Sequence, residues 1–392
     1  MLLRLSVWTT GANILKLVCF FTLCGILVAG LWPFHAPANR VSWLKDNAGL
    51  RFGRDGVVLG TGKLAWSGTS NENSFSFGIW IVPGLASDSS TFLAFYAPGS
   101  RGQFSLRQSS SDLELLGENF GSQTLNNDAR LYVPEVFRKG RPVFVTVTAA
   151  RGQTVVYIDG MPARKTSEFP PLAEELTGEV VVGTSPVQND GWTGELRGLE
   201  IYGRELTPTE VLQNFQSWIR QGRPDTDRND CNLALYLFRD GSGKKVRNQT
   251  RSGLDLYIPE KFIIPHEKLL EAPWEEYHSG WSYWTNLLIN IGGFVPLGFF
   301  VLACFGPEHR ARRAALLTVA FCGAVSLTIE ILQGFLPTRD SGLTDVLTNT
   351  LGGTLGVMLY SLTGAGRLLN WLLLIVAPAV SGRLRQCATS SD

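Results

Sequence analysis

The sequence is short of charge, of histidine and of cysteines that could pair. Only 18% of its 392 residues are charged, and 35 lysines and arginines balance 34 aspartates and glutamates, which argues against a nucleic-acid binder. No CxxC, HxxxH or HExxH spacing occurs, so a zinc site built from one local motif is excluded. Cys231 is the single cysteine of the polar middle of the chain, which excludes a disulfide within that region. Any chemistry therefore rests on carboxylates, amides or hydroxyls.

Long apolar runs are present instead, and they are concentrated at the two ends of the chain. Crossing a bilayer takes about 20 helical residues. We expect four spans, at about 14–34, 284–305, 314–336 and 345–362, and a fifth candidate at 368–380 that is short and contains Pro378. The first run also resembles a signal peptide, because Ala36-Pro37-Ala38 is similar to a cleavage site, although we favour an anchor. The pattern predicts a multi-pass membrane protein.

Basic residues in short loops predict the direction of these spans, because such loops stay in the cytoplasm. They flank the first span and crowd the loop between the second and third: Arg4, Lys16, Arg310, Arg312 and Arg313. The N-terminus is then cytoplasmic, and the chain divides into a first helix at 1–34, an outer domain at 35–274 and a helical bundle at 275–392.

The region 35–274 has short alternating runs separated by Gly, Asn, Asp and Pro, a pattern typical of two packed antiparallel sheets. The dipeptide Asp159-Gly160 predicts a hairpin turn. Thr207, Pro208 and Glu210 have the spacing of a capping box that begins a helix. We expect an all-β sandwich that carries one helix.

Two segments of this region, FVTVTAARGQTVVYIDGMPA and GEVVVGTSPVQNDGWTGELRGLEIYGRELTPTEV, resemble the laminin-G/concanavalin A-like jelly roll. A later segment, LALYLFRDGSGKKVRNQTRSGLDLYI, resembles strands that often come first in such modules, and we infer that it completes the same sandwich. Such modules often bind glycans, although a fold alone does not imply a function.

The candidate glycan-binding residues of the sandwich are Asn189, Asp190 and Trp192. Trp192 could stack on a sugar or be a core residue at the start of a strand, and we favour the core interpretation. Calcium could bind at Asp159, Asp190 or Asn189, but no fixed ligand spacing supports it. The sequence therefore predicts no cofactor.

Polar residues within the predicted spans are the most informative feature, since ionisable groups in a membrane are costly and point to function. Each of the last three spans carries such residues on one helix face: Asn286 and Asn290, then Ser326, Glu330 and Gln333, then Asp345 and Asn349. Because successive spans alternate in direction, all three sets lie toward the outer leaflet. The loop at 338–341 caps them and supplies a cation, Arg339.

The segments GLWPF, NLLINIGGFVPLGF and SLTIEILQGFLPTRDSGLTDVLTNTLGGTLG resemble the VanZ-like family of bacterial membrane proteins. This resemblance implies that the protein lies in the bacterial cytoplasmic membrane. It also implies an association with resistance to the glycopeptide teicoplanin, for which the family has no established biochemical mechanism. Asn286 departs from the family, where an Asp is usual. If that Asp serves as an acid or base, this chain has lost it, which weakens an enzymatic interpretation.

Three interpretations follow. In the first, the outer-leaflet cluster binds a lipid head group or cell-wall precursor, Arg339 holds a phosphate or carboxylate, and the jelly roll contacts glycan or protein. An enzymatic version, which we do not favour, makes Glu330 a general acid or base beside an ionised Asp345. In the second, a sensor or scaffold, only the jelly roll binds and the spans are an anchor. In the third, the polar residues hold the helices together, with Arg339 paired to Glu330 or Asp345.

Overall fold

The computed structural model describes residues 2–46, 48–64, 74–84, 89–96, 102–119, 129–150, 152–167, 169, 178–187, 189–224, 233–250, 254–265, 269–277, 280–305 and 311–362. The chain forms two compact units, Ala36–Glu267 and Met1–His35 with Lys268–Asp392. The fifth candidate span at 368–380, Arg310 and Cys231 lie outside the described residues. Residues 268–274, which we predicted to be part of the outer domain, fall in the helical unit.

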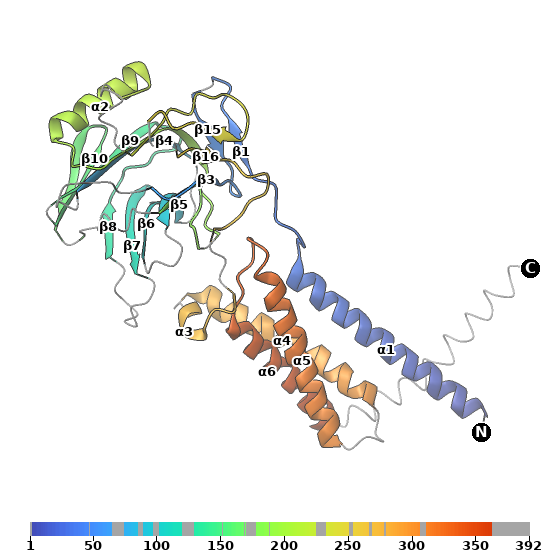
Figure 1. The fold of residues 1–392 in the computed structure, drawn as a ribbon. Helices are drawn as coiled ribbons and strands as arrows, with labels where there is room; N and C mark the ends of the chain where they lie inside the picture. Colours follow the sequence, from blue (N-terminus) through green and yellow to red (C-terminus); the bar gives the residue numbers. More distant parts are fainter. Residues whose placement is uncertain are drawn as a thin grey trace, which may run out of the picture. The chain divides into compact units, whose positions relative to one another are not determined.

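The first unit is a sandwich of two sheets (Figure 1). Within the described residues each sheet has eight strands, and neighbouring strands pair antiparallel. One sheet has the order β1 (Val41–Trp43), β2 (Leu50–Phe52), β13 (Gly194–Tyr202), β4 (Phe75–Pro83), β9 (Val143–Ala150), β10 (Gln153–Ile158) and β11 (Met161–Thr166), with β14 (Ala234–Tyr236) also paired to β13. The other has the order β15 (Lys245–Val246), β16 (Leu256–Tyr257), β3 (Val58–Gly60), β12 (Glu179–Val182), β5 (Ser90–Tyr96), β6 (Gly102–Ser109), β7 (Asp112–Asn119) and β8 (Ala129–Val133).

The core lies between the sheets and is rich in aromatic side chains. Phe77 of β4 packs against Phe95 of β5 and Phe104 of β6, with ring centroids 5.8 Å apart in both contacts. The predicted turn at Asp159-Gly160 joins β10 to β11, and both residues have positive φ angles, 51° and 79°, as a type I′ turn requires. The segment after residue 233 completes the sandwich as predicted, since β14 joins one sheet and β16 the other.

Helix α2 (Pro208–Gln221) covers part of the first sheet. Its N-terminus has the predicted capping box, in which Thr207 and Glu210 bond each other's backbone N–H. The helix is fastened to β13 through the fully buried carboxyl of Glu200. The Trp218 Nε1–H donates to Glu200 Oε2 at 2.8 Å, and the Asn214 amide donates to Glu200 Oε1 at 3.3 Å.

Glu200 makes the stability of the sandwich depend on pH. Burial raises the pKa of Glu200 from 4.5 to about 7, although its hydrogen-bond donors oppose the shift. Between these values the folded protein holds a proton that the unfolded chain releases, so the free energy of unfolding falls as the pH rises, by about 3 kcal/mol in total. We expect Glu200→Gln to abolish most of this dependence. Thermal unfolding of the wild type and of Glu200→Gln at pH 5 and pH 8 measures this dependence. An equal loss of stability between the two pH values in both proteins would contradict the prediction.

The second unit is helical, with α1 (Leu2–Leu31), the short α3 (Pro273–Glu276), α4 (Trp281–Phe305), α5 (Ala311–Gln333) and α6 (Leu343–Leu362). Of the described residues, three stretches are long and apolar enough to cross a membrane: Asn13–Leu31, Trp281–Phe305 and Ala311–Gln333. The predicted span at 345–362 forms α6 but is not among them. Polar side chains along α6 lower its hydropathy. Three of the four predicted spans are therefore long and apolar enough to cross a membrane.

Glycines allow α4 and α6 to pack backbone against backbone. A Cβ atom at Gly298 of α4 would collide with the backbone of Gly353 in α6. Cβ atoms at Gly352 and Gly356 of α6 would collide with the carbonyl oxygens of Ile291 and Val295 in α4. This close approach brings the polar residues of the two helices within hydrogen-bonding distance.

Candidate functional site

The centre of the candidate site is Glu330 of α5, whose side chain is 1% exposed. Its Oε2 accepts the backbone N–H of Gly342 at 2.9 Å, and its backbone carbonyl accepts the Ser341 hydroxyl at 2.7 Å. A second carboxylate, Glu276 of α3, accepts the backbone N–H of Thr344 at 3.2 Å. Both carboxylates therefore bond the N-terminus of α6, where unpaired N–H groups and the helix dipole favour negative charge.

Asp345 adds a third carboxylate in the first turn of α6. Its Oδ1 accepts the side-chain amide of Asn290 in α4 at 2.7 Å. One turn further along α6, the Asn349 amide donates to Ser326 Oγ of α5 at 2.9 Å. The structure thus brings together Asn290, Glu330, Asp345 and Asn349, which the sequence predicted to converge. We call these four residues, with Glu276 and Ser326, the carboxylate cluster.

Several acceptors in and beside this cluster are buried without a partner. Asn349 Oδ1 and Gln333 Oε1 have no hydrogen bond within the described part of the chain, and their side chains are 6% and 8% exposed. The hydroxyl of Thr344 is unpartnered in the same sense. A buried acceptor without a donor costs about 1–3 kcal/mol. The site is therefore able to accept hydrogen bonds from a ligand.

Arg339 does not form the ion pair with Glu330 or Asp345 that the third interpretation requires. Its guanidinium donates to the carbonyl of Trp32 from Nε at 3.1 Å and from Nη2 at 2.7 Å, and to that of Ala29 at 3.4 Å. These carbonyls follow or end α1, where a cation is favourable. This corrects the ion-pair interpretation. The side chain remains exposed.

Two other predicted residues are not members of the cluster, although Gln333 lies beside it, one turn after Glu330 in α5. Gln333 donates to the carbonyl of Gly30 in α1 at 2.8 Å, so it fastens α5 to α1 as Arg339 does. Asn286 is exposed near the start of α4. Glu276, in contrast, was missed by the sequence analysis. It lies outside every apolar run, and only the fold brings it to α6.

The candidate glycan-binding residues of the sandwich are mostly engaged. Trp192 is 1% exposed and donates from Nε1 to Gln108 Oε1 at 2.7 Å, so its ring faces are covered. This corrects the sugar-stacking interpretation in favour of the core one. Asp190 accepts the Thr91 hydroxyl at 2.6 Å and the Ser185 N–H at 2.7 Å, and pairs with Arg107 at 3.2 Å. Asn189 alone is exposed.

No group of three or more His, Cys, Asp or Glu side chains among the described residues is placed to hold a metal ion. The expectation of no cofactor stays a prediction, and calcium at Asp159, Asp190 or Asn189 stays an alternative that no ligand spacing supports.

Each of the two units contains residues that match the model of a known protein family. Residues 233–364 match the VanZ/LLP1 family model. The chain contains a VanZ-like domain. Protein VanZ of Enterococcus faecium is 35% identical over 78 residues, which cover 20% of this chain and 45% of that protein, so the match spans less than half of this relative's length. The VanZ-like match begins at residue 233, whereas the structure places β14, β15 and β16 in the sandwich.

Residues 54–212 match the model of the concanavalin A-like lectin/glucanases superfamily. Similar solved structures include a putative carbohydrate binding protein from Bacteroides ovatus, 13% identical, with a TM-score of 0.37 and coverage of 57% of this chain and 58% of that one. A heptameric pentraxin from Limulus polyphemus is 14% identical with a TM-score of 0.33, and the match covers 53% and 90% of the two chains. The Ruminococcus gnavus sialidase module CBM40, solved with sialyllactose, is 15% identical with a TM-score of 0.33 and coverage of 42% and 94%.

Proposed function

We propose that this protein binds a lipid head group or a lipid-linked cell-wall precursor through the carboxylate cluster, at the outer leaflet of the bacterial cytoplasmic membrane. The observation that carries the proposal is Glu330, a buried carboxyl that pairs with no cation among the described residues and lies beside unpartnered acceptors. In this proposal the sandwich is extracytoplasmic and contacts glycan or protein, the N-terminus is cytoplasmic, and the role is linked to glycopeptide resistance.

The outward face of α6 supports the proposal that it is a fourth span. Its three glycines are buried, including Gly352, and so are Thr344 and Asn349. Val357 is buried as well, but six of its apolar side chains are exposed: Leu347, Leu351, Leu355, Met358, Leu359 and Leu362. This arrangement is the reverse of a water-soluble amphipathic helix and suits a helix with lipid on one side.

A group of exposed aromatic side chains supports the placement of the carboxylate cluster near a membrane surface. The segment after α1, the region of the short α3 and the start of α4 carry six aromatic side chains that are all more than half exposed: Trp32, Phe34, Trp274, Tyr277, Trp281 and Trp284. Tryptophan and tyrosine favour the interface between the hydrocarbon and water. The bonds of Arg339 to Trp32 and of Asn290 to Asp345 place this group of aromatic side chains at the same end of the bundle as the carboxylate cluster.

The charges of the site favour one kind of head group. Buried carboxylates and amide oxygens accept hydrogen bonds, so they fit hydroxyl or ammonium donors. Arg339 is exposed at the same end and fits a phosphate. We therefore propose a head group that carries a phosphate together with hydroxyl or ammonium groups. Catalysis is not proposed, since the Ser341 hydroxyl donates to a backbone carbonyl rather than to any of the three carboxylates of the cluster.

Mass spectrometry of the lipids that copurify with the intact protein tests this proposal. We expect one phosphate-containing lipid or precursor to be enriched with the wild type and lost, by roughly 10-fold or more, in Glu330→Gln and Arg339→Ala. Asp340→Asn is the matched control, because it removes an exposed carboxylate from the same loop and should retain the ligand. Yield and thermal stability of each variant are compared first.

The alternative is a sensor or scaffold in which only the sandwich binds ligand. It is supported by Gln333 and Arg339, which fasten α1 and so have a structural role. Bulk phospholipid that is unchanged by any of the three substitutions would favour this alternative and reject the head-group site.

A further inference from the structure

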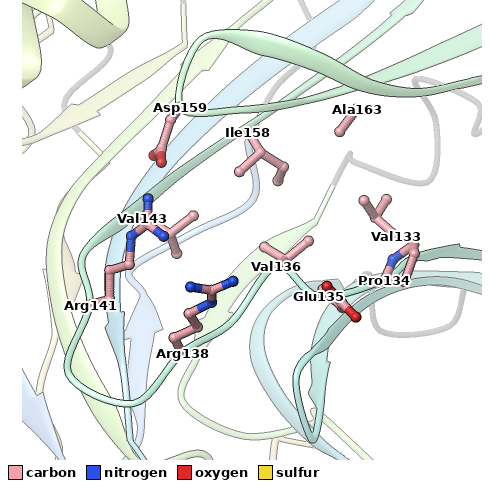
Figure 2. Close-up of a pocket in the computed structure, with 10 residues that line it drawn as sticks. All are labelled: Val133, Pro134, Glu135, Val136, Arg138, Arg141, Val143, Ile158, Asp159 and Ala163. Carbon is pink, nitrogen blue, oxygen red and sulfur yellow. The ribbon is translucent and has the colours of Figure 1, made fainter.

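A hollow of about 250 Å³ lies on the sandwich beside the loop that joins β8 to β9 (Figure 2). Besides that loop, residues of β8, of the first position of β9 and of the β10–β11 hairpin line it. Arg138 and Arg141 contribute two guanidinium groups, and Glu135 and Asp159 contribute two carboxylates. We call it the arginine pocket. It shares no residue with the carboxylate cluster or with the Asp190 contacts.

The two arginines occupy the first and last positions of one β-turn. The Arg141 N–H donates to the Arg138 carbonyl at 3.0 Å, and Gly140 has a φ of 71°, as the third residue of a type II turn requires. The ends of a turn lie within about 7 Å of each other. The turn therefore anchors both arginines close together, and both side chains line the same hollow.

The loop that carries these arginines is fastened to the sandwich at several points. The Gly140 N–H donates to the Pro83 carbonyl at 3.1 Å. The Glu135 N–H donates to Asp112 Oδ1 at 2.9 Å, and the Phe137 N–H donates to the Ser111 carbonyl at 2.7 Å. A backbone held in this way loses little conformational freedom when a ligand binds.

The arginines and the carboxylates of the pocket differ in the partners that they already have. Neither the Arg138 nor the Arg141 guanidinium bonds or pairs with any side chain that the structure describes, and both residues are exposed. Asp159 already accepts the Phe144 N–H at 2.9 Å. Two neighbouring guanidinium groups repel each other, and an oxyanion between them relieves this repulsion while accepting paired hydrogen bonds.

The remaining lining identifies the rest of the ligand. Val133, Val136, Val143 and Ile158 give the pocket an apolar wall, which suits the C–H face of a sugar ring. Glu135 can accept hydroxyl groups. The volume lies just below the range of about 300–1,000 Å³ that is typical of drug-sized ligands, so it suits a single sugar unit.

We propose that the arginine pocket binds one acidic sugar unit, whose carboxylate or phosphate is held between Arg138 and Arg141. This inference rests on the glycan-binding role proposed for the sandwich, and it gives that role a site and a ligand class.

Calorimetric titration of the full-length protein in nanodiscs of neutral lipid tests the arginine pocket. The probes are glucuronate, glucose 6-phosphate, glucose and inorganic phosphate at matched ionic strength. At least one acidic sugar should bind, with glucose and inorganic phosphate each weaker by roughly 10-fold or more. The first two probes distinguish a carboxylate from a phosphate as the bound group.

Variants of the turn decide whether these arginines are responsible. Arg138→Gln and Arg141→Gln should each weaken the acidic sugar by roughly 10-fold or more. Lys139→Gln removes the same charge from the same turn at a residue that does not line the pocket, so it should bind as the wild type does. Equal losses in all three variants, binding of inorganic phosphate as tight as that of either acidic sugar, or no acidic sugar bound would overturn the inference.

Glu330→Gln separates this inference from the head-group proposal. It should bind the acidic sugar like the wild type even though it loses the copurifying lipid. If the lipid result fails while sugar binding persists, only the carboxylate cluster loses its proposed function. If sugar binding fails while the lipid result holds, only the arginine pocket does.

Discussion

Trp192→Ala is expected to lower the free energy of unfolding of the sandwich by about 3–5 kcal/mol, the usual effect of truncating a buried aromatic residue to alanine. The indole is almost fully buried, packs beside Phe52 and Phe92 with ring centroids 5.9 Å away, and satisfies Gln108. The substitution leaves a large cavity and an unpaired buried acceptor. Chemical denaturation of the full-length protein, followed by tryptophan fluorescence or circular dichroism, measures the loss.

Trp192→Phe is the matched comparison for this prediction. It keeps an aromatic ring in the core but removes the Nε1–H donor, so its loss should be smaller than that of Trp192→Ala. A Trp192→Ala variant with unchanged stability and weakened glycan binding would instead restore the sugar-stacking interpretation and contradict the buried position of this side chain.

Gly356→Ala is expected to destabilise the helical unit by at least the roughly 1–3 kcal/mol that overpacking costs in a protein core. The added Cβ would collide with the Val295 carbonyl and crowd the Phe299 N–H, and neither backbone atom can move without separating α4 from α6. Gly352→Ala, which meets the Ile291 carbonyl, should behave alike. Thermal denaturation in detergent, followed by the loss of monodisperse protein, measures the effect.

Gly293→Ala provides the matched control for this prediction, because a Cβ atom there meets nothing within 4 Å. Alanine also has a higher helix propensity than glycine by about 1 kcal/mol, so this variant should be as stable as the wild type or more so. Equal destabilisation by Gly356→Ala and Gly293→Ala would show that helix propensity, rather than close packing, decides the outcome.

The sequence predicted the sandwich well because its signals are local. Alternating runs, the Asp159-Gly160 turn and the capping box at Thr207 each depend on neighbouring residues, and each is present in the structure. The segment after 233 was assigned to the sandwich by resemblance, and its pairing with β13 and β3 agrees. Trp192 was harder to interpret, because the sequence around a tryptophan at the start of a strand has the same pattern whether the side chain lies in the core or on the surface.

The candidate site was predictable only in part. Helical spacing and alternating span direction were enough to bring Asn290, Glu330, Asp345 and Asn349 together. They could not identify the partner of Arg339, since a guanidinium bonds carboxylates and helix-end carbonyls alike, and the choice depends on where α1 ends. Glu276 carries no sequence signal, because its role depends on the position of α6.

The bonds from Gln333 to Gly30 and from Arg339 to Trp32 have a consequence for the order of assembly. They join residues 303 and 307 positions apart, so α1 leaves the ribosome long before its partners exist. The sandwich residues are synthesised in between and can fold first, since domains generally fold as units during synthesis. We expect α1 to wait in the membrane for α5, and a ribosome stalled before residue 333 to hold a folded sandwich on an incompletely assembled bundle.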